Sequence, residues 1–265
     1  MTWLDPLSRA LHGQSGQHGP VMLMYHAVTP GRRRPAWPWA VSMRQFRDQL
    51  DFLGAEGYAT PTMAELAAVP AKTWSGRTAV ITFDDGYVDN LAACEELRKR
   101  GMRATWFIVS GSIGREPQWP ADGRPAGRLL NADELREMQA GGMEIGSHTV
   151  SHVRLPDLDD AALMRELTDS RTALEALLGA PVGSFAYPYG AWNEHCAAAV
   201  RRAGYTAACT TRSGWALRDN TPFQLRRLTV FNTDTTATLA RKQALATNDG
   251  SWAAMFAYVR DRFRR

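Results

Sequence analysis

The segment TAVITFDDGY, residues 78–87, decides the fold. Its first six residues are apolar or β-branched and predict a buried strand, which the polar Asp-Asp-Gly then ends. In α/β folds, functional side chains follow the carboxyl ends of parallel strands. The segment therefore predicts two adjacent carboxylates, Asp84 and Asp85, at the functional edge of a sheet.

Strand segments and helical segments alternate along the whole chain. Ser42 and Thr62 are each followed three residues later by Gln or Glu, the spacing of a helix-capping box, and so is Asn131. This alternation indicates parallel strands with crossover helices, and seven strands predict an α/β fold of distorted (β/α)7 barrel type. We find no internal repeat, so residues 1–265 are expected to form a single domain with a short N-terminal extension over residues 1–19. The strand candidates are residues 21–28, 78–83, 103–109, 142–147, 182–187, 205–210 and 226–231.

A second polar cluster, SHTVSH at residues 147–152, follows the predicted strand 142–147. On one helical turn, His148 and His152 would lie on the same side, about 5–6 Å apart. A catalytic metal site combines three His or Asp ligands with an open position. The spacing predicts Asp85, His148 and His152 as ligands of one divalent ion, zinc before nickel, cobalt or iron. Asp84 then stays free to take a proton from a water that the ion activates. The alternative for either cluster alone is an ordinary turn.

Three motifs in this order resemble the polysaccharide deacetylases, the NodB-homology domain of carbohydrate esterase family 4. They are Thr-Phe-Asp-Asp-Gly, the His148/His152 pair and Pro188-Tyr189-Gly190, and the resemblance covers roughly residues 20 to 232. It implies a hydrolase that removes N-acetyl groups from an N-acetylhexosamine-containing glycan. Asp84 would be the base, Asp85 and both His the metal ligands, and the backbone amide of Tyr189 part of the oxyanion site. Tyr87 and Pro188, within these motifs, are predicted to contact substrate.

The chain departs from the family pattern at two places. No Arg stands in residues 184–190, where the family carries one that braces the base, and no His follows His195 to serve as the C-terminal acid. The N-terminal segment VMLMYHAV, residues 21–28, is similar to the Tyr-His-x-[Val/Ile] start of the poly-β-1,6-N-acetylglucosamine deacetylases. That resemblance implies His26 as general acid, and an imidazole is suited to the role because it titrates near neutrality. A His that merely ends the first strand is the alternative.

This interpretation calls for two partner side chains, a carboxylate beside His26 and an arginine beside Asp84. His26 would need a carboxylate to orient it and raise its pKa. Asp234, just past the strand at 226–231, is our candidate and Asp219 the rival, with an ordinary surface Asp as the alternative for both. Arg226 or Arg227 could replace the absent brace, although both lie at the start of their strand.

Tryptophan is concentrated in apparent loops, which include residues 29–41 and 111–128. Flat aromatic faces suit the apolar faces of sugar rings, whereas a large side chain also packs wherever it fits. Trp192 is the best placed for substrate contact because it closely follows Pro188-Tyr189-Gly190. The other candidates are Trp37, Trp39, Trp119 and Trp215.

Composition is that of an ordinary globular enzyme, with 45% hydrophobic and 22% charged residues and a net charge of +4. The runs Arg32–Arg34 and Arg260–Arg265 are more typical of solvated surface than of a nucleic-acid interface, so a carbohydrate and no nucleic acid is the expected partner. No sequence feature specifies an oligomeric state. An odd number of cysteines, three, makes a disulfide framework unexpected.

Localisation is expected to be cytoplasmic, because the first twenty residues lack an apolar stretch long enough for a signal-peptide core. A chain trimmed of its leader would look the same, and an extracytoplasmic location would then apply. No run of about 18 apolar residues is present, so no integral membrane segment is expected.

Two alternatives to N-deacetylation remain open from the sequence. Removal of an O-acetyl group from a sugar ester needs the same residues with less help from the acid. A glycan-binding module would keep the fold without turnover; the absent brace favours that reading, and the retained ligands and base oppose it.

Overall fold

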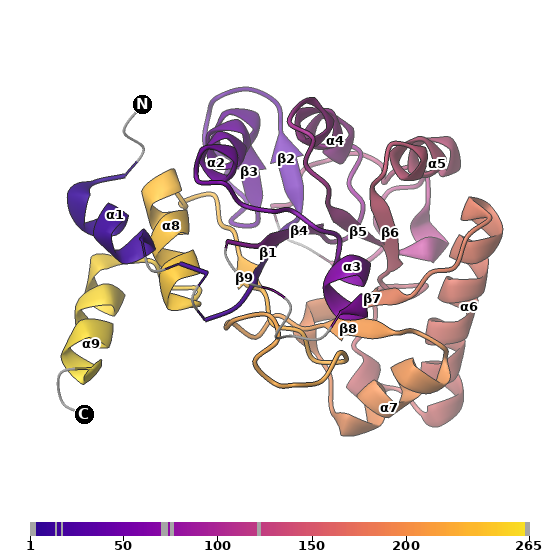
Figure 1. The fold of residues 1–265 in the computed structure, drawn as a ribbon. Coiled ribbons are helices and arrows are strands. Elements are labelled where there is room, and N and C mark those ends of the chain that lie inside the picture. The colour runs from indigo at the N-terminus through magenta and orange to yellow at the C-terminus, as the bar shows by residue number, and fades with distance from the viewer. Residues whose placement is uncertain are drawn as a thin grey trace.

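The computed structural model describes residues 4–13, 15, 16, 18–69, 74, 77–120 and 123–262. Within them, seven parallel strands form one curled sheet covered on its outer side by helices (Figure 1). A parallel bridge between Cys209 and Leu225 joins one edge of the sheet to the segment before the strand at the other edge. The expected distorted (β/α)7 barrel is therefore confirmed. Across the sheet the strands are β8 (Ala207–Cys209), β7 (Ser184–Ala186), β6 (Glu144–Ser147), β5 (Thr105–Ile108), β4 (Ala79–Phe83), β1 (Val21–Tyr25) and β9 (Leu228–Thr229).

The helices that separate the strands begin where the sequence predicts caps. Side chains of Ser42, Thr62 and Asn131 accept hydrogen bonds from the backbone three residues on, at the starts of α2, α3 and α5. Each bond satisfies a backbone N–H that has no partner inside the helix. The helices are α1 (Pro6–His12), α2 (Met43–Ala55), α3 (Met63–Ala68), α4 (Asn90–Lys99), α5 (Ala132–Ala140), α6 (Asp160–Leu178), α7 (Glu194–Arg202), α8 (Thr236–Leu245) and α9 (Trp252–Arg262).

The expected strand at residues 21–28 is interrupted at His26. After β1, the segment β2 (Ala27–Thr29) leaves the main sheet and pairs in parallel with β3 (Ala40–Ser42), so that a small sheet forms at the two ends of the expected loop. The loop at residues 30–39 therefore has both ends fixed beside the carboxyl end of β1. This break also releases His26 from strand pairing.

Alternate residues of the strands pack on opposite faces of the sheet, as strand geometry requires. Met22, Val80 and Phe107 belong to a buried cluster on one face, whereas Leu23 and Ile81 belong to the larger cluster that the helices cover. Both faces are buried, which explains why the strands read as continuous apolar runs.

The N-terminal extension is anchored to the rest of the chain, at the left of Figure 1. Helix α1 packs against α8, and Ser8 accepts a hydrogen bond from Arg241 at 2.7 Å. The three cysteines are buried and free: Cys94 in α4, Cys196 in α7 and Cys209 in β8.

Candidate active site

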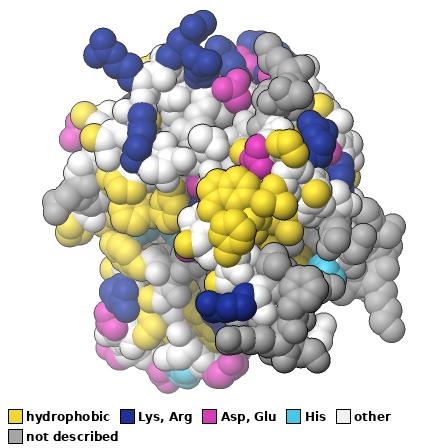
Figure 2. Space-filling model, turned by 90° about the vertical axis from the view of Figure 1, so that its left-hand side faces the viewer, with side chains coloured by type: hydrophobic (Ala, Val, Ile, Leu, Met, Phe, Trp, Pro, Cys, Tyr) yellow, Lys and Arg dark blue, Asp and Glu magenta, His cyan; other side chains and the backbone are white. Residues whose placement is uncertain are grey.

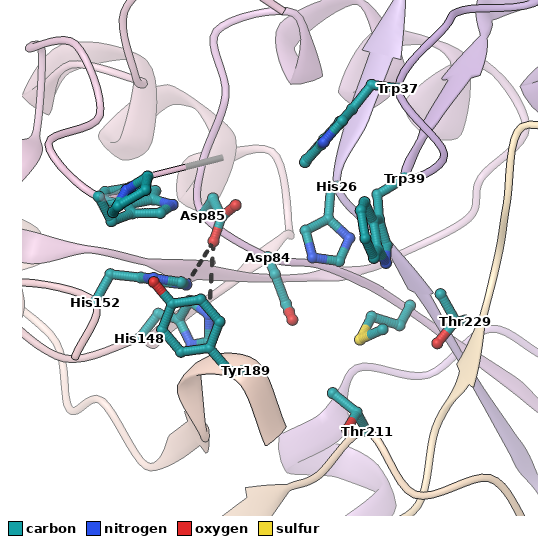
Figure 3. A pocket seen from close by; sticks show the side chains of 13 residues that line it. His26, Trp37, Trp39, Asp84, Asp85, His148, His152, Tyr189, Thr211 and Thr229 are labelled. Carbon is teal, nitrogen blue, oxygen red and sulfur yellow. Dashed lines mark ion pairs between the residues drawn. The ribbon is translucent and has the colours of Figure 1, made fainter. Parts of the chain in front are cut away.

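A pocket of about 530 Å³ opens at the carboxyl ends of the central strands (Figure 3). In β1 and β4, Tyr25 pairs with Phe83, so the residues that follow them, His26 and Asp84, leave the sheet at the same level. Segments distant in the sequence thus meet in one cavity. It is lined by Met24, His26, Trp37, Trp39, Asp84, Asp85, Trp119, Pro120, His148, His152, Tyr189, Thr211 and Thr229.

Three buried donor groups converge on one side of this pocket. Asp85 Oδ1 lies 3.6 Å from His148 Nε2 and 3.3 Å from His152 Nε2, and the three donor atoms all lie within 4.8 Å of one another. The expected helical turn is wrong: residues 148–152 form a loop after β6. Positive φ at Thr149 and His152, and a hydrogen bond from the His152 N–H to Thr149 Oγ1, bend this loop so that both imidazoles reach Asp85.

These donors fit a divalent metal ion. His148 Nδ1 is 2.7 Å from the Ala186 carbonyl, which sets the tautomer that leaves a lone pair on Nε2. Burial lowers the pKa of His148 to about 4, so the ring is neutral, as a ligand must be. Asp85 Oδ1 is buried without a hydrogen-bond partner among the described residues. An unpaired buried carboxylate oxygen facing two imidazole nitrogens is the donor set of a zinc-type site.

We predict that His148→Ala lowers bound metal from about one ion per chain to a small fraction of that, because two ligands seldom hold a catalytic ion. Elemental analysis of the purified proteins measures it. His195→Ala is the matched control, since His195 is half exposed and pairs with Asp160. Equal metal in wild type and His148→Ala would show that the donors do not form the site.

Asp84 is braced by an arginine from the opposite end of the strands. Arg227 donates two parallel hydrogen bonds to its carboxylate, at 2.6 and 2.8 Å, and both side chains are buried. Arg227 precedes β9, and its side chain passes Phe107 and the Thr210 carbonyl on the way to Asp84. The arginine absent from residues 184–190 is thus replaced by Arg227. Its neighbour Arg226 pairs with Asp219 instead.

The brace keeps Asp84 ionised. Burial alone would raise the pKa of Asp84, but the charge of Arg227 and its hydrogen bonds outweigh burial and lower this pKa below its ordinary value. Asp84 is therefore an anion at neutral pH and is able to accept a proton.

His26 lines the pocket beside the two carboxylates, with its ring directed between Asp84 and Trp39 in Figure 3. Burial lowers the pKa of His26, and the charges of Asp85 and Asp84 oppose this only in part. A lowered pKa makes the protonated ring a stronger proton donor, but it also leaves the ring mostly neutral at pH 7, so His26 must take up a proton before it can act as an acid. Its Nδ1 has no hydrogen-bond partner among the described residues.

The predicted carboxylate partners of His26, Asp234 and its rival Asp219, are both wrong. Asp234 is buried in a different pair: its Oδ2 lies 2.5 Å from Lys242 Nζ and accepts a hydrogen bond from the Phe231 N–H at 2.8 Å. Asp219 is occupied by Arg226. Neither carboxylate lines the pocket.

Tyr189 stands at the rim, 47% exposed, with its ring 4.5 Å from that of His152. Its φ of 58° is left-handed, and so are those of Asp85, Thr149 and His152. Only Asn220 and Ala246 share this property among the described non-glycine residues. Backbone strain of this kind concentrates at functional sites. The turn is also tight: a Cβ on Gly190 would lie 2.0 Å from Thr211 Oγ1.

Three expected substrate contacts do not reach the pocket. Tyr87 is buried against Trp37, Pro188 is buried at the start of its turn, and Trp192 packs against the core near Tyr187. The aromatic walls are Trp37, Trp39 and Trp119 instead. All three stand in the two loops that the sequence singled out, and this loop position was the available signal. Trp119 stacks on His152 with ring centroids 4.5 Å apart.

Comparison with known proteins shows the family to which the chain belongs. The family model for polysaccharide deacetylase matches residues 71–208. A Bacillus subtilis (strain 168) protein named as a polysaccharide deacetylase, YxkH, is 32% identical over 212 residues, which are 79% of this chain and 70% of that protein. The chain belongs to the polysaccharide deacetylase family.

Further relatives agree in sequence and fold. The poly-β-1,6-N-acetyl-D-glucosamine N-deacetylase of Staphylococcus aureus is 26% identical over 179 residues, covering 63% of this chain and 59% of that protein. The structure of IcaB from Ammonifex degensii superposes with a TM-score of 0.69 at 26% identity, over 86% of this chain and 97% of that one. The deacetylase PplD of Streptococcus pyogenes has the same fold, with a TM-score of 0.73, 24% identity, and coverage of 83% and 96%.

No helix in the described part of the chain is long and apolar enough to cross a bilayer.

Proposed function

We propose that this protein is a metal-dependent hydrolase that removes N-acetyl groups from an N-acetylhexosamine-containing glycan. One observation carries the proposal. The Arg227-braced carboxylate of Asp84, the donor set of Asp85, His148 and His152, and the His26 ring all face the same pocket. Amide hydrolysis needs a base for water, an electrophilic centre and an acid for the departing nitrogen, and these groups correspond to the three roles.

The base acts first. A divalent ion bound at the donor set would polarise the acetyl carbonyl and lower the pKa of water. Asp84 accepts the proton as the water oxygen bonds to the carbonyl carbon, and Arg227 holds both carboxylate oxygens in place. Because the pKa of Asp84 is held low, the anion is present over the whole neutral range.

The negative charge then develops on the acetyl oxygen, where the backbone amide of Tyr189 is proposed to donate a hydrogen bond. Its left-handed backbone sets the direction of that amide. Protonated His26 gives its proton to the nitrogen as the carbon–nitrogen bond breaks, and acetate and a free amine leave. The proton that Asp84 accepted from water then restores His26 to its protonated form. Zinc is the ion that the donor set favours.

The shape of the site suits a sugar chain. Trp37, Trp39 and Trp119 give the pocket apolar walls against which sugar rings can stack. A neighbouring hollow of about 460 Å³ shares Trp119, His152 and Tyr189 with the pocket and continues past them. Such a groove accommodates sugar units on either side of the reacting one, in agreement with the polymer named for the S. aureus relative.

Acetate release across a panel of substrates tests the proposal. The panel comprises N-acetylglucosamine oligomers, nucleotide sugars and acetylated xylan. We expect turnover of the oligomers. Turnover confined to acetylated xylan would identify an O-acetyl esterase, and binding of the oligomers without acetate release by the metal-loaded protein would identify a glycan-binding module. The absence of an arginine from residues 184–190 favoured a glycan-binding module, but Arg227 braces Asp84 in its place, so this argument for the module no longer holds.

We predict that His26→Ala lowers N-deacetylation by about 10²-fold, at the lower end of what a positioned acid contributes. Hydrolysis of an aryl acetate should fall far less, because its leaving group needs no proton. The ratio of the two kcat/KM values measures this, with metal content as the control. Equal losses on both substrates would assign His26 a structural role.

A further inference from the structure

A second, positively charged hollow lies on the other side of the loop that carries Trp37 and Trp39. It has a volume of about 330 Å³, and Arg32, Arg34 and Arg44 line it. Figure 2 shows Lys and Arg side chains gathered along the upper edge of the molecule, the height at which the loop between β2 and β3 lies in Figure 1. We call this feature the arginine hollow.

Its positive charge is only partly compensated. Arg32 has no ion pair or hydrogen bond among the described residues, and Arg34 donates only to the uncharged Asn232 side chain, at 3.3 Å. Arg44 faces Asp48 at 3.7 Å, with both side chains more than half exposed. The other acid that lines the hollow, Asp234, is neutralised by Lys242. The balance favours an anion.

Two segments link the arginine hollow to the pocket. Trp37 lines the pocket and Arg34 the hollow, three residues apart on one loop. Thr229, the last residue of β9, lines the pocket, and Asn232, three residues later, lines the hollow. Three residues span at most about 10 Å. The Asn232 side chain holds the two segments together, donating to the carbonyls of Pro35 at 2.8 Å and Trp37 at 3.3 Å.

We propose that the arginine hollow is a subsite for an anionic substituent, a carboxylate or a phosphate, on the same glycan chain whose acetamide occupies the pocket. Guanidinium groups match both anions in charge and geometry. Proximity to the pocket favours a substrate-borne anion over a membrane or a nucleic acid. The proposal rests on the proposed function for the identity of the chain, whereas anion binding itself is independent of turnover.

The test is equilibrium binding of two oligosaccharides of equal length by the wild type, the double variant Arg32→Ser/Arg44→Ser and a matched control. One oligosaccharide is a neutral N-acetylglucosamine oligomer, and the other alternates N-acetylglucosamine with glucuronate. Arg34 is kept because its contact with Asn232 supports the loop. The control, Arg165→Ser/Arg202→Ser, removes two exposed arginines from α6 and α7.

We expect the double variant to lose about 2- to 30-fold in affinity for the acidic oligomer, the worth of two exposed ion contacts. Its affinity for the neutral oligomer should be unchanged, and the wild-type preference for the acidic oligomer should decline with salt. Free glucuronate and inorganic phosphate, added as competitors, show which anion the hollow prefers.

Three results would contradict the proposed subsite. The first is equal affinity of the wild type for both oligomers, and the second is an equal loss of affinity for the acidic oligomer in the double variant and in its control. The third is that the hollow binds anionic phospholipid vesicles or DNA but not the acidic oligomer. Failure of the proposed function looks different: neither oligomer would release acetate, whatever the binding results.

Discussion

Asp84→Asn is expected to lower kcat for N-deacetylation by about 10²–10⁴ while leaving metal content unchanged, because it removes the proposed general base. Asp84 lies beside the proposed ligand Asp85 in sequence, but its two oxygens are engaged by Arg227 rather than facing the imidazoles. The amide retains one oxygen that accepts from Arg227, but the buried guanidinium loses its counter-charge, so the variant is also expected to be less stable than the wild type. Steady-state kinetics and elemental analysis on the same preparation measure both quantities.

The neighbouring carboxylate supplies the matched control. Asp85→Asn weakens a proposed ligand, whose Oδ1 faces His148 and His152 at 3.6 and 3.3 Å, and should lose metal together with activity. The two substituted residues are neighbours in the sequence, but Asp84 is the proposed base and Asp85 a proposed metal ligand. Loss of metal from Asp84→Asn in step with its activity would show that the base and ligand assignments are wrong.

Arg227→Met is expected to lower the free energy of unfolding by about 3–5 kcal/mol at neutral pH, since it leaves Asp84 as an uncompensated buried charge. The same variant should be nearly inactive, because the carboxylate loses both its orientation and its ionised form. Chemical denaturation of wild type and variant measures the difference in stability.

The pH dependence of the stability loss in Arg227→Met shows whether the unpaired charge of Asp84 causes it. In the wild type the pKa of Asp84 is held below its ordinary value, so the ionised pair contributes stability above the unfolded pKa of about 3.9 and loses it as pH falls through the folded pKa. Without Arg227, burial raises the folded pKa above the unfolded one. Ionised Asp84 is then destabilising at pH 7, and protonation relieves the penalty as pH falls through the raised value. The loss should therefore be smaller at pH 5 than at pH 7.

A double variant separates this effect from loss of packing. Asp84→Asn/Arg227→Met contains no unpaired charge at the site and should be more stable than Arg227→Met alone at pH 7. An equal loss at both pH values, with no recovery in the double variant, would mean that Arg227 stabilises the protein through packing against Phe107 and its other neighbours rather than through Asp84.

Much of the fold was predictable because the apolar runs and helix caps are local signals. The buried run at residues 79–83 forms β4, and Asn131 with Glu134 forms the capping box expected of it. The small sheet of β2 and β3 was missed, since strands of three residues carry little pattern. The pocket residues His26, Asp84, Asp85 and His148 were also predictable, because each follows a strand whose carboxyl end lies at the same edge.

Partners joined across the barrel were harder to predict. Arg227 lies at the start of its strand, and only the three-dimensional path of its side chain brings it to Asp84. Asp234 was chosen for its position after a strand, but Lys242, eight residues later, holds it in a separate buried pair. Trp192 follows the Pro-Tyr-Gly motif in sequence and yet packs on the core. Sequence distance gives no direction for a side chain, and these assignments depended on direction.

The most direct test of the central claim is acetate release from N-acetylglucosamine oligomers by the purified protein, before and after removal of metal with a chelator. The proposed function predicts release by the untreated protein, its loss after chelation and its return when a divalent ion, zinc first, is added back. Release that persists at the same rate in protein shown by elemental analysis to be free of metal would contradict it, and so would the absence of release from fully metal-loaded protein.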